Sequence, residues 1–156
     1  QNWIVEKEVT SNDFYGSFRT HIQFPSYVQQ NDRTNMEQWI KDNTPKESLF
    51  LTMPSLNDFR MNAQRSVFFD YHNTNPIYFS KNFAYEWVSR MNELGIKSYS
   101  SNVKELDIIY SNISYDRLIY LNDKYNVTHA VFPASNNLNF TKIYDNNSYV
   151  VYCIIC

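Results

Sequence analysis

The segment WIKDNTPKESLFLTMP, residues 39–54, constrains the fold of this chain more than any other part of the sequence. A helix that enters this segment must end before Pro45, because proline cannot continue a helix and favours extended backbone in the residue before it. The apolar run Leu49–Leu51 follows and is typical of a buried strand. A helix, a turn and a buried strand in this order predict the start of an α/β layer, although none of these residues carries catalytic chemistry.

Size and composition favour one folded domain. The chain has 156 residues, of which 43% are hydrophobic and 17% aromatic, so it has material for a sizeable core and is too apolar to be disordered. The formal net charge is −2 without a basic block, and we therefore expect no nucleic-acid partner. Only two glycines occur, which excludes the glycine-rich phosphate loops of nucleotide-binding proteins, and we expect no cofactor.

Periodicity and capping residues predict the other elements. We expect a helix over residues 35–42 with Thr34 as its N-cap and Glu37 completing a capping box. A longer helix is expected to begin after Ser80 and to end at Leu94, with Gly95 as the residue that follows its end. Two more helices are expected, from a cap at residue 101 or 102 through residue 109 and from a cap at residue 114 to residue 124. The expected strands cover residues 48–53, 65–72, 129–133, 140–144 and 149–155.

These elements predict an α/β fold, with a small mixed sheet of four to five strands and helices packed on it in a single two-layer or three-layer domain. We expect the domain to cover residues 34–156. Residues 1–33 have weak periodicity and are expected to form a connector. The chain begins with Gln1 and has no apolar run of about 18 residues, the length that spans a membrane. Either a leader was removed or the chain is a fragment of a longer protein, and the weak periodicity of the first 30 residues favours the fragment.

Several motifs of the chain resemble a known group of proteins. In order they are WIKDNTPKESLFL at 39–51, FR at 59–60, RSVFFD at 65–70, EWVSR at 86–90 and DRLIYLNDKYNVTHAVFP at 116–133. Over residues 35–155 the chain resembles the soluble C-terminal domain of a family of uncharacterised bacterial multi-spanning membrane proteins. More loosely, it is similar to the extracytoplasmic tails of polytopic glycosyltransferases that use lipid-linked sugars.

The resemblance implies a location and partners. It implies a non-catalytic domain on the extracytoplasmic face of a membrane, anchored through a membrane region of the same protein. It also implies a role in glycan or envelope-polysaccharide machinery, with a glycan or a lipid-linked sugar as the ligand. Two alternatives stay open, namely a self-contained carbohydrate-binding or anion-binding module and a small hydrolase or transferase.

Charged and polar residues gather around the second expected strand and the helix after it. The candidate binding residues are Asp58, Arg60, Arg65, Asp70, His72 and Arg90. Ligands of open α/β sheets bind beyond the carboxyl ends of the strands, and arginine binds phosphate or carboxylate groups with two hydrogen bonds. The pattern therefore predicts an anion site, or else a set of ion pairs that fix the strand to the helix.

The same residues allow more specific expectations. Asp70 and His72 alternate on the expected strand, so their side chains should share one face, as an acid/base pair of a hydrolase would require. Two such ligands are too few for a metal, and we expect no metal site. Glu86 and Arg90 are four residues apart on a helix and should form an ion pair. Arg65 is expected to pair with a carboxylate, that of Asp58, rather than with an anion.

Aromatic and cysteine residues add two expectations. Six aromatic residues are candidates for a sugar-stacking surface, and of these Phe83 and Trp87 have the spacing of core residues. The six are Trp39, Tyr78, Phe79, Phe83, Tyr85 and Trp87. Cys153 and Cys156 form a C-x-x-C motif in a β-branched run rather than at a helix start, where redox motifs lie. We interpret them as plain strand residues whose side chains point to opposite faces.

Overall fold

The protein has the expected mixed α/β fold, with a five-stranded sheet in the order β2-β1-β3-β5-β4. The computed structural model describes residues 31–72, 74–97 and 102–155, so the expected connector lies outside the described residues as far as residue 30. The strands are β1 Leu49–Leu51, β2 Ser66–Val67, β3 His129–Pro133, β4 Thr141–Asp145 and β5 Tyr149–Cys153. β1 pairs in parallel with β2 and β3, whereas β5 pairs antiparallel with β3 and β4.

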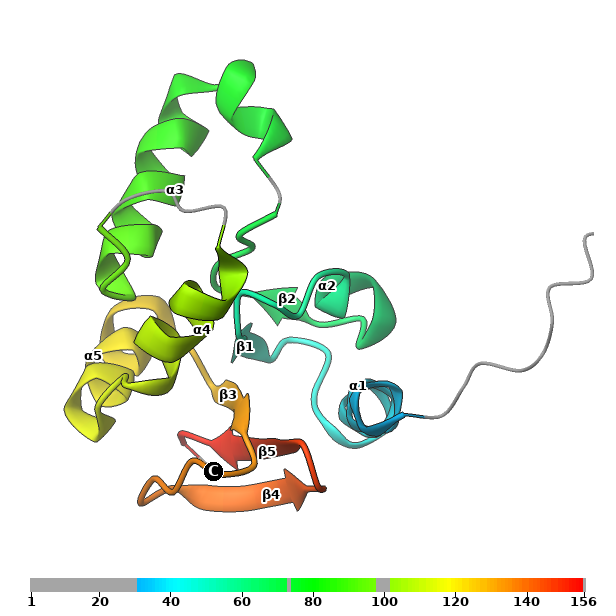
Figure 1. Cartoon of the computed structure of the whole chain (residues 1–156). Coiled ribbons are helices and arrows are strands. Elements are labelled where there is room, and N and C mark those ends of the chain that lie inside the picture. Colours follow the sequence, from blue (N-terminus) through cyan, green and yellow to red (C-terminus); the bar gives the residue numbers. More distant parts are fainter. Residues whose placement is uncertain (1–30, 73, 98–101, 156) are drawn as a thin grey trace, which may run out of the picture.

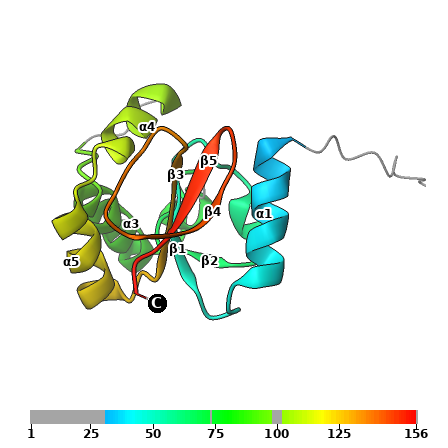
Figure 2. The same ribbon diagram turned by 90° about the horizontal axis from the view of Figure 1, so that it is seen from below.

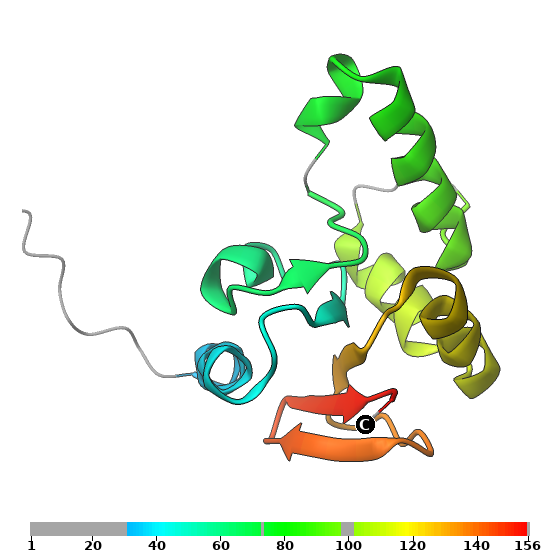
Figure 3. The ribbon, with the colours of Figure 1, turned by 180° about the vertical axis from the view of Figure 1, so that it is seen from behind.

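Helices cover both faces of the sheet, which makes the fold three-layered (Figures 1 and 2). The helical elements are α1 Asp32–Asn43, α2 Phe59–Asn62, the 3-10 helix η1 Asn75–Tyr78, α3 Lys81–Glu93, α4 Val103–Ser111 and α5 Tyr115–Tyr125. α1 and α2 lie on one face, and α3, α4 and α5 lie on the other, as the view from behind also shows (Figure 3). No helix within the described ranges has both the length and the apolar character needed to cross a membrane.

Alternation along the strands divides the core into two clusters, one on each face of the sheet. Phe50, Val131 and Val151 point toward α1 and α2, where they meet Met36 and Phe59. The neighbouring strand residues point toward α3, α4 and α5 and belong to the larger cluster; they are Leu51, Ala130, Phe132, Val150 and Tyr152. The central strands are thus buried on both faces, as their continuous apolar runs predict.

The helix boundaries follow local capping signals, with one difference from the expected pattern. α1 begins one turn early, because Asn31 is its N-cap and accepts a hydrogen bond of 2.9 Å from the backbone N of Thr34. Thr34 completes the capping box from the third helical position, and Glu37 binds Arg33 and Asn62 instead. α3 behaves as predicted, since Ser80 caps its start. Gly95 follows its end with a φ of 80°, a conformation that favours glycine.

The second expected strand, residues 65–72, is wrong in length, because β2 contains only Ser66 and Val67. β2 pairs only with the short β1, and the backbone N of Phe68 makes the last hydrogen bond, to the carbonyl of Phe50. Phe68 and Phe69 are then both buried against α3, where the ring of Phe69 lies 5.1 Å from that of Trp87 and the guanidinium of Arg90 lies 5.2 Å from the ring of Phe68. Packing beneath α3, rather than sheet pairing, therefore explains the apolar pattern after Val67.

Cys153 is the last residue of β5, as the interpretation as a strand residue predicts, but it is not a plain strand residue, because it is disulfide-bonded. Its partner lies outside the described residues. β5 ends at Cys153 and the chain bends at Ile154, so the alternation of a strand does not extend beyond Cys153. The argument from opposite faces therefore fails at this point of the chain.

Candidate functional site

The strongest candidate site lies where the chain leaves the parallel strands β1 and β2. The carboxyl ends of parallel neighbours meet at one edge of a sheet, the edge at which α/β proteins bind ligands. Here the segment after β1 leads into α2, and the segment after β2 leads toward α3. Four of the six predicted residues come together at this edge. A hollow of about 480 Å³ is lined by Asp58, Arg60, Met61, Asp70 and His72.

A deeper pocket adjoins this hollow, and Arg60 and Asp70 line both. The pocket has a volume of about 170 Å³ and lies between α2, the segment after β2, and α3. Arg90 is the fifth predicted residue at the site. We call this cavity the Arg60 pocket, and its lining residues are Arg60, Val67, Phe68, Phe69, Asp70, Phe83, Glu86, Trp87 and Arg90.

Arg60 lines both the pocket and the hollow, and its side chain has no polar partner among the described residues. Its guanidinium makes no hydrogen bond and no ion pair with any residue that the structure describes. The residue is exposed in the short helix α2. Asp58 precedes this helix with a φ of 61°, in the left-handed region that aspartate tolerates better than most residues. An unpaired guanidinium with five N–H donors can donate hydrogen bonds to a bound anion.

Asp70 and His72 both lie at the hollow but have structural contacts. The Oδ1 atom of Asp70 accepts a hydrogen bond of 3.1 Å from the backbone N of His72. The Nε2 atom of His72 lies 3.1 Å from the carbonyl oxygen of Pro54, which can only accept, so this nitrogen carries the proton. These contacts hold the segment after β2 against the segment after β1. They add no support to the alternative of a hydrolase that uses the two residues as an acid/base pair.

Arg90 forms the base of the pocket and joins α3 to the segment after β2. It forms the predicted ion pair with Glu86. Its Nη1 atom donates a hydrogen bond of 2.6 Å to the carbonyl oxygen of Phe68, and its guanidinium lies 5.2 Å from the centre of the Phe68 ring. Its Nε atom is buried and has no hydrogen-bond partner among the described residues. Arg90 therefore positions the aromatic wall while its remaining donor is unused.

Arg65 lies away from the site, at the amino end of β2. Its side chain is 5% exposed and donates hydrogen bonds of 2.9 Å to Thr44 Oγ1, 2.6 Å to the Thr44 carbonyl and 2.7 Å to the Lys41 carbonyl. The expectation that Arg65 pairs with Asp58 is therefore wrong. The carbonyl groups at the end of α1 have no partner within the helix and carry the negative end of its dipole, so they bind the guanidinium instead.

The six aromatic candidates do not form one stacking surface. Trp39 lies on α1, on the other side of the sheet, where its ring centre is 5.1 Å from that of Tyr144. Trp87 is buried and Phe83 is half-buried, and both line the Arg60 pocket. The remaining three, Tyr78, Phe79 and Tyr85, are exposed around the start of α3. Sequence reasoning missed Phe68 and Phe69 as pocket residues, because two consecutive aromatic residues also fit a strand that is buried on both faces.

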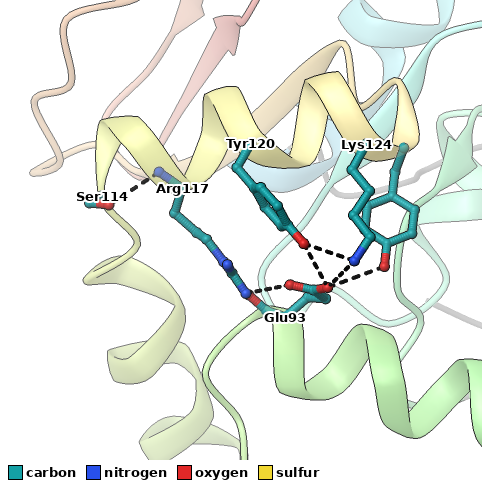
Figure 4. A network of polar contacts seen from close by, with 6 residues as sticks. Glu93, Ser114, Arg117, Tyr120 and Lys124 are labelled. Carbon is teal, nitrogen blue, oxygen red and sulfur yellow. Dashed lines mark hydrogen bonds and ion pairs between the residues drawn. The ribbon is translucent and has the colours of Figure 1, made fainter.

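A second polar cluster joins the end of α3 to α5 (Figure 4). The carboxylate of Glu93 accepts hydrogen bonds from Arg117, from Lys124 Nζ at 2.8 Å and from Tyr120 OH at 3.2 Å. The hydrogen bond from Lys124 is the largest cause that lowers the pKa of Glu93, and burial opposes it. All these contacts are between protein groups, so the cluster is a structural link. Sequence reasoning missed it because its members are far apart in the chain.

His129, on β3, is buried and also lies outside the site. Its ring stacks on Phe50 with a distance of 4.8 Å between centres, and its Nδ1 atom lies 2.8 Å from Thr128 Oγ1. Burial, followed by the charge of Arg65, lowers the pKa of His129. Within the described ranges no three His, Cys, Asp or Glu side chains gather as metal ligands would.

A comparison with protein families gives a match that covers the site. Residues 31–94 match a family model described as a domain of unknown function (DUF6798). This segment runs from the cap of α1 to the end of α3 and contains every residue that lines the Arg60 pocket. No curated protein and no solved structure matches the chain.

Proposed function

We propose that this chain is a non-catalytic, extracytoplasmic binding domain of a polytopic membrane protein, and that the Arg60 pocket binds an anionic glycan. The observation that carries the proposal is the guanidinium of Arg60, which has no partner among the described residues and lies where the pocket meets the hollow. The expected ligand class is a sugar that bears a phosphate or carboxylate group. A lipid-linked sugar phosphate of envelope-glycan machinery belongs to this class.

The lining of the pocket suits both parts of such a ligand. Arg60 offers paired donors to a phosphate or carboxylate, and hydrogen bonds to charged groups are stronger than those between neutral groups. Asp58 and Asp70 offer acceptors for sugar hydroxyl groups at the hollow. Phe83 and Trp87 supply the apolar wall against which the C–H face of a sugar ring can pack. With about 170 Å³, the pocket has room for a single sugar unit rather than a long oligosaccharide.

Two observations support a location outside the cytoplasm. Cys153 is disulfide-bonded, and disulfides form and persist mainly in oxidising compartments such as the periplasm and the extracellular space. The motif order over residues 35–155 resembles that of domains attached to multi-spanning membrane proteins. We therefore propose the membrane-spanning part of the same protein as the principal partner of this domain.

The ligand proposal is tested by titrating the 156-residue chain with glucose 1-phosphate, glucose and inorganic phosphate, followed by calorimetry and by NMR of the backbone amides. We expect glucose 1-phosphate to bind more tightly than either component and to shift amides around α2 and the start of α3. The variant Arg60→Ala should bind at least about tenfold more weakly, because it loses charged hydrogen bonds of about 1.5–3 kcal/mol each. Lys104→Ala, which removes an exposed cation from α4, is the matched control and should bind like the wild type.

Two results would contradict the ligand proposal. One is the absence of any response to all three compounds, and the other is an Arg60→Ala variant that binds as the wild type does. The location is tested separately, by reading the gene upstream of Gln1 and by fusing a topology reporter to the C-terminus of the full-length protein. We expect preceding membrane helices and an extracytoplasmic reporter, and a cytoplasmic reporter would overturn the location.

A further inference from the structure

The corner between η1 and α3 carries an aromatic surface that the Arg60 pocket does not use. The side chains of Tyr78 and Phe79 are 82% and 90% exposed, so they make little contact with the rest of the described structure. Tyr85 is also exposed, one turn further along α3, and Lys81 Nζ lies 5.6 Å from the centre of its ring. We call Tyr78, Phe79, Lys81 and Tyr85 the aromatic tip.

The tip lies on a protruding corner of the fold. Figures 1 and 3 show the corner between η1 and α3 at the extreme end of the molecule, opposite the hairpin of β4 and β5. Stable protein interfaces bury about 800 Å² on each partner and need a broad complementary surface. Two adjacent aromatic rings on a protruding corner can insert into a lipid bilayer more readily than they can pack on a flat protein surface. Exposed apolar side chains that are contiguous, as Tyr78 and Phe79 are, mark interaction sites more than single ones do.

The charge of the residues around the tip indicates which kind of lipid bilayer it would bind. Residues 74–85 contain no Asp or Glu, and Lys81 is their only charged residue. Aromatic side chains are enriched at the interface between membrane and water, and a nearby cation attracts anionic lipid headgroups. We propose that the aromatic tip docks on a bilayer that contains anionic lipid, with Tyr78 and Phe79 at the level of the headgroups and Lys81 beside a lipid phosphate.

This docking would place the Arg60 pocket near the membrane surface. Phe83, Glu86, Trp87 and Arg90 line the pocket and follow the tip along α3. At a rise of about 1.5 Å per residue, Arg90 lies about 14 Å along the helix axis from Lys81. The inference stands apart from the ligand of the pocket, since substitutions at the tip leave Arg60 in place. The ligand proposal for the Arg60 pocket and the docking proposal for the aromatic tip can therefore fail independently of each other.

The test is flotation of the 156-residue chain with vesicles of phosphatidylglycerol and phosphatidylcholine in equal parts, and with vesicles of phosphatidylcholine alone. We expect the wild type to float with the mixed vesicles. The double variant Tyr78→Ser/Phe79→Ser should lose at least about tenfold in partition coefficient, because it removes the apolar area that enters the bilayer. Lys81→Gln should remove the preference for mixed vesicles over phosphatidylcholine alone.

Two further variants control for non-specific binding to vesicles, and a folding measurement accompanies them. Ile108→Ser removes a side chain that is 63% exposed on α4, outside the tip, and should float like the wild type. Phe79→Trp should bind at least as tightly as the wild type, because tryptophan is favoured at the interface. Circular dichroism should show the same melting temperature for every variant, since the substituted side chains are exposed.

Several results would overturn the docking proposal. They are a wild type that floats with neither kind of vesicle, a double variant that floats as the wild type does, and an Ile108→Ser variant that loses as much binding as the double variant. Light scattering supplies the remaining outcome. A concentration-dependent dimer that the double variant loses, without vesicle binding by the wild type, would make the tip a surface for self-association instead.

Discussion

Arg65 donates two hydrogen bonds to Thr44, one of 2.9 Å to its hydroxyl oxygen and one of 2.6 Å to its carbonyl oxygen. The contact joins the residue before β2 to the residue that caps the end of α1. It is buried, and it supplies donors to carbonyl groups that the helix itself leaves without a partner. A side chain that the sequence presents as a candidate for anion binding is thus part of the scaffold.

Replacement of Arg65 should therefore affect stability rather than binding. We expect Arg65→Met to lower the free energy of unfolding by about 2–4 kcal/mol, because it leaves buried carbonyl groups unpaired. Arg65→Lys keeps the charge but lacks the planar fork, and should recover less than half of this loss. Urea denaturation measures both. Arg60→Ala is the matched control and should stay within about 0.5 kcal/mol of the wild type, so equal losses at both positions would contradict the assignment.

Tyr110 makes a second structural contact, which can be tested by a substitution that removes only its hydroxyl group. Its buried hydroxyl lies 2.8 Å from the carbonyl of Val131 and 3.1 Å from that of Leu51, and so bridges β3 and β1. Burial raises the pKa of Tyr110, and the hydroxyl stays a donor. We expect Tyr110→Phe to cost about 1–2 kcal/mol in urea denaturation without changing the fold. A cost near zero would show that the bridge is energetically neutral.

Glu93 should contribute stability only while it is ionised. Its pKa is lowered in the folded protein, so its contribution is complete above the ordinary carboxyl pKa of about 4.3 and is lost as the pH falls through the lower folded value. At pH 7 we expect Glu93→Gln to cost about 1 kcal/mol, because the contacts with Arg117 and Lys124 are partly exposed. The difference from the wild type should vanish in acid. Urea denaturation at a series of pH values checks this, and a difference independent of pH would contradict it.

His129 should make the fold sensitive to mild acid. Its pKa is lowered in the folded state, so the unfolded chain binds a proton at a higher pH than the folded protein does. Stability is therefore complete above the unfolded pKa of about 6.5 and declines as the pH falls below it. We expect His129→Gln to flatten this part of the profile of unfolding free energy against pH. Identical slopes for the variant and the wild type below pH 6.5 would rule out His129 as the cause.

Local signals determined most of the secondary structure. Ser80, Ser114 and Gly95 mark helix ends in the structure as they do in the sequence, because a cap involves only residues within one turn. The apolar run of β3 covers His129–Pro133, as predicted. The mixed α/β class followed from the order of these elements, since a helix, a turn and a buried strand recur along the chain.

Tertiary structure decided what the local pattern left open. β2 stops after Val67 although β1 continues to Leu51, because Phe68 and Phe69 leave the sheet and pack beneath α3, a contact that the sequence of β2 does not contain. Arg60 and Arg65 are both arginines near the same strand. Among the described residues, the fold leaves Arg60 without a partner at a pocket and buries Arg65 against the end of α1. The difference arises because a side chain's partners are set by segments far away in the chain, which come together only when the sheet and the helices pack.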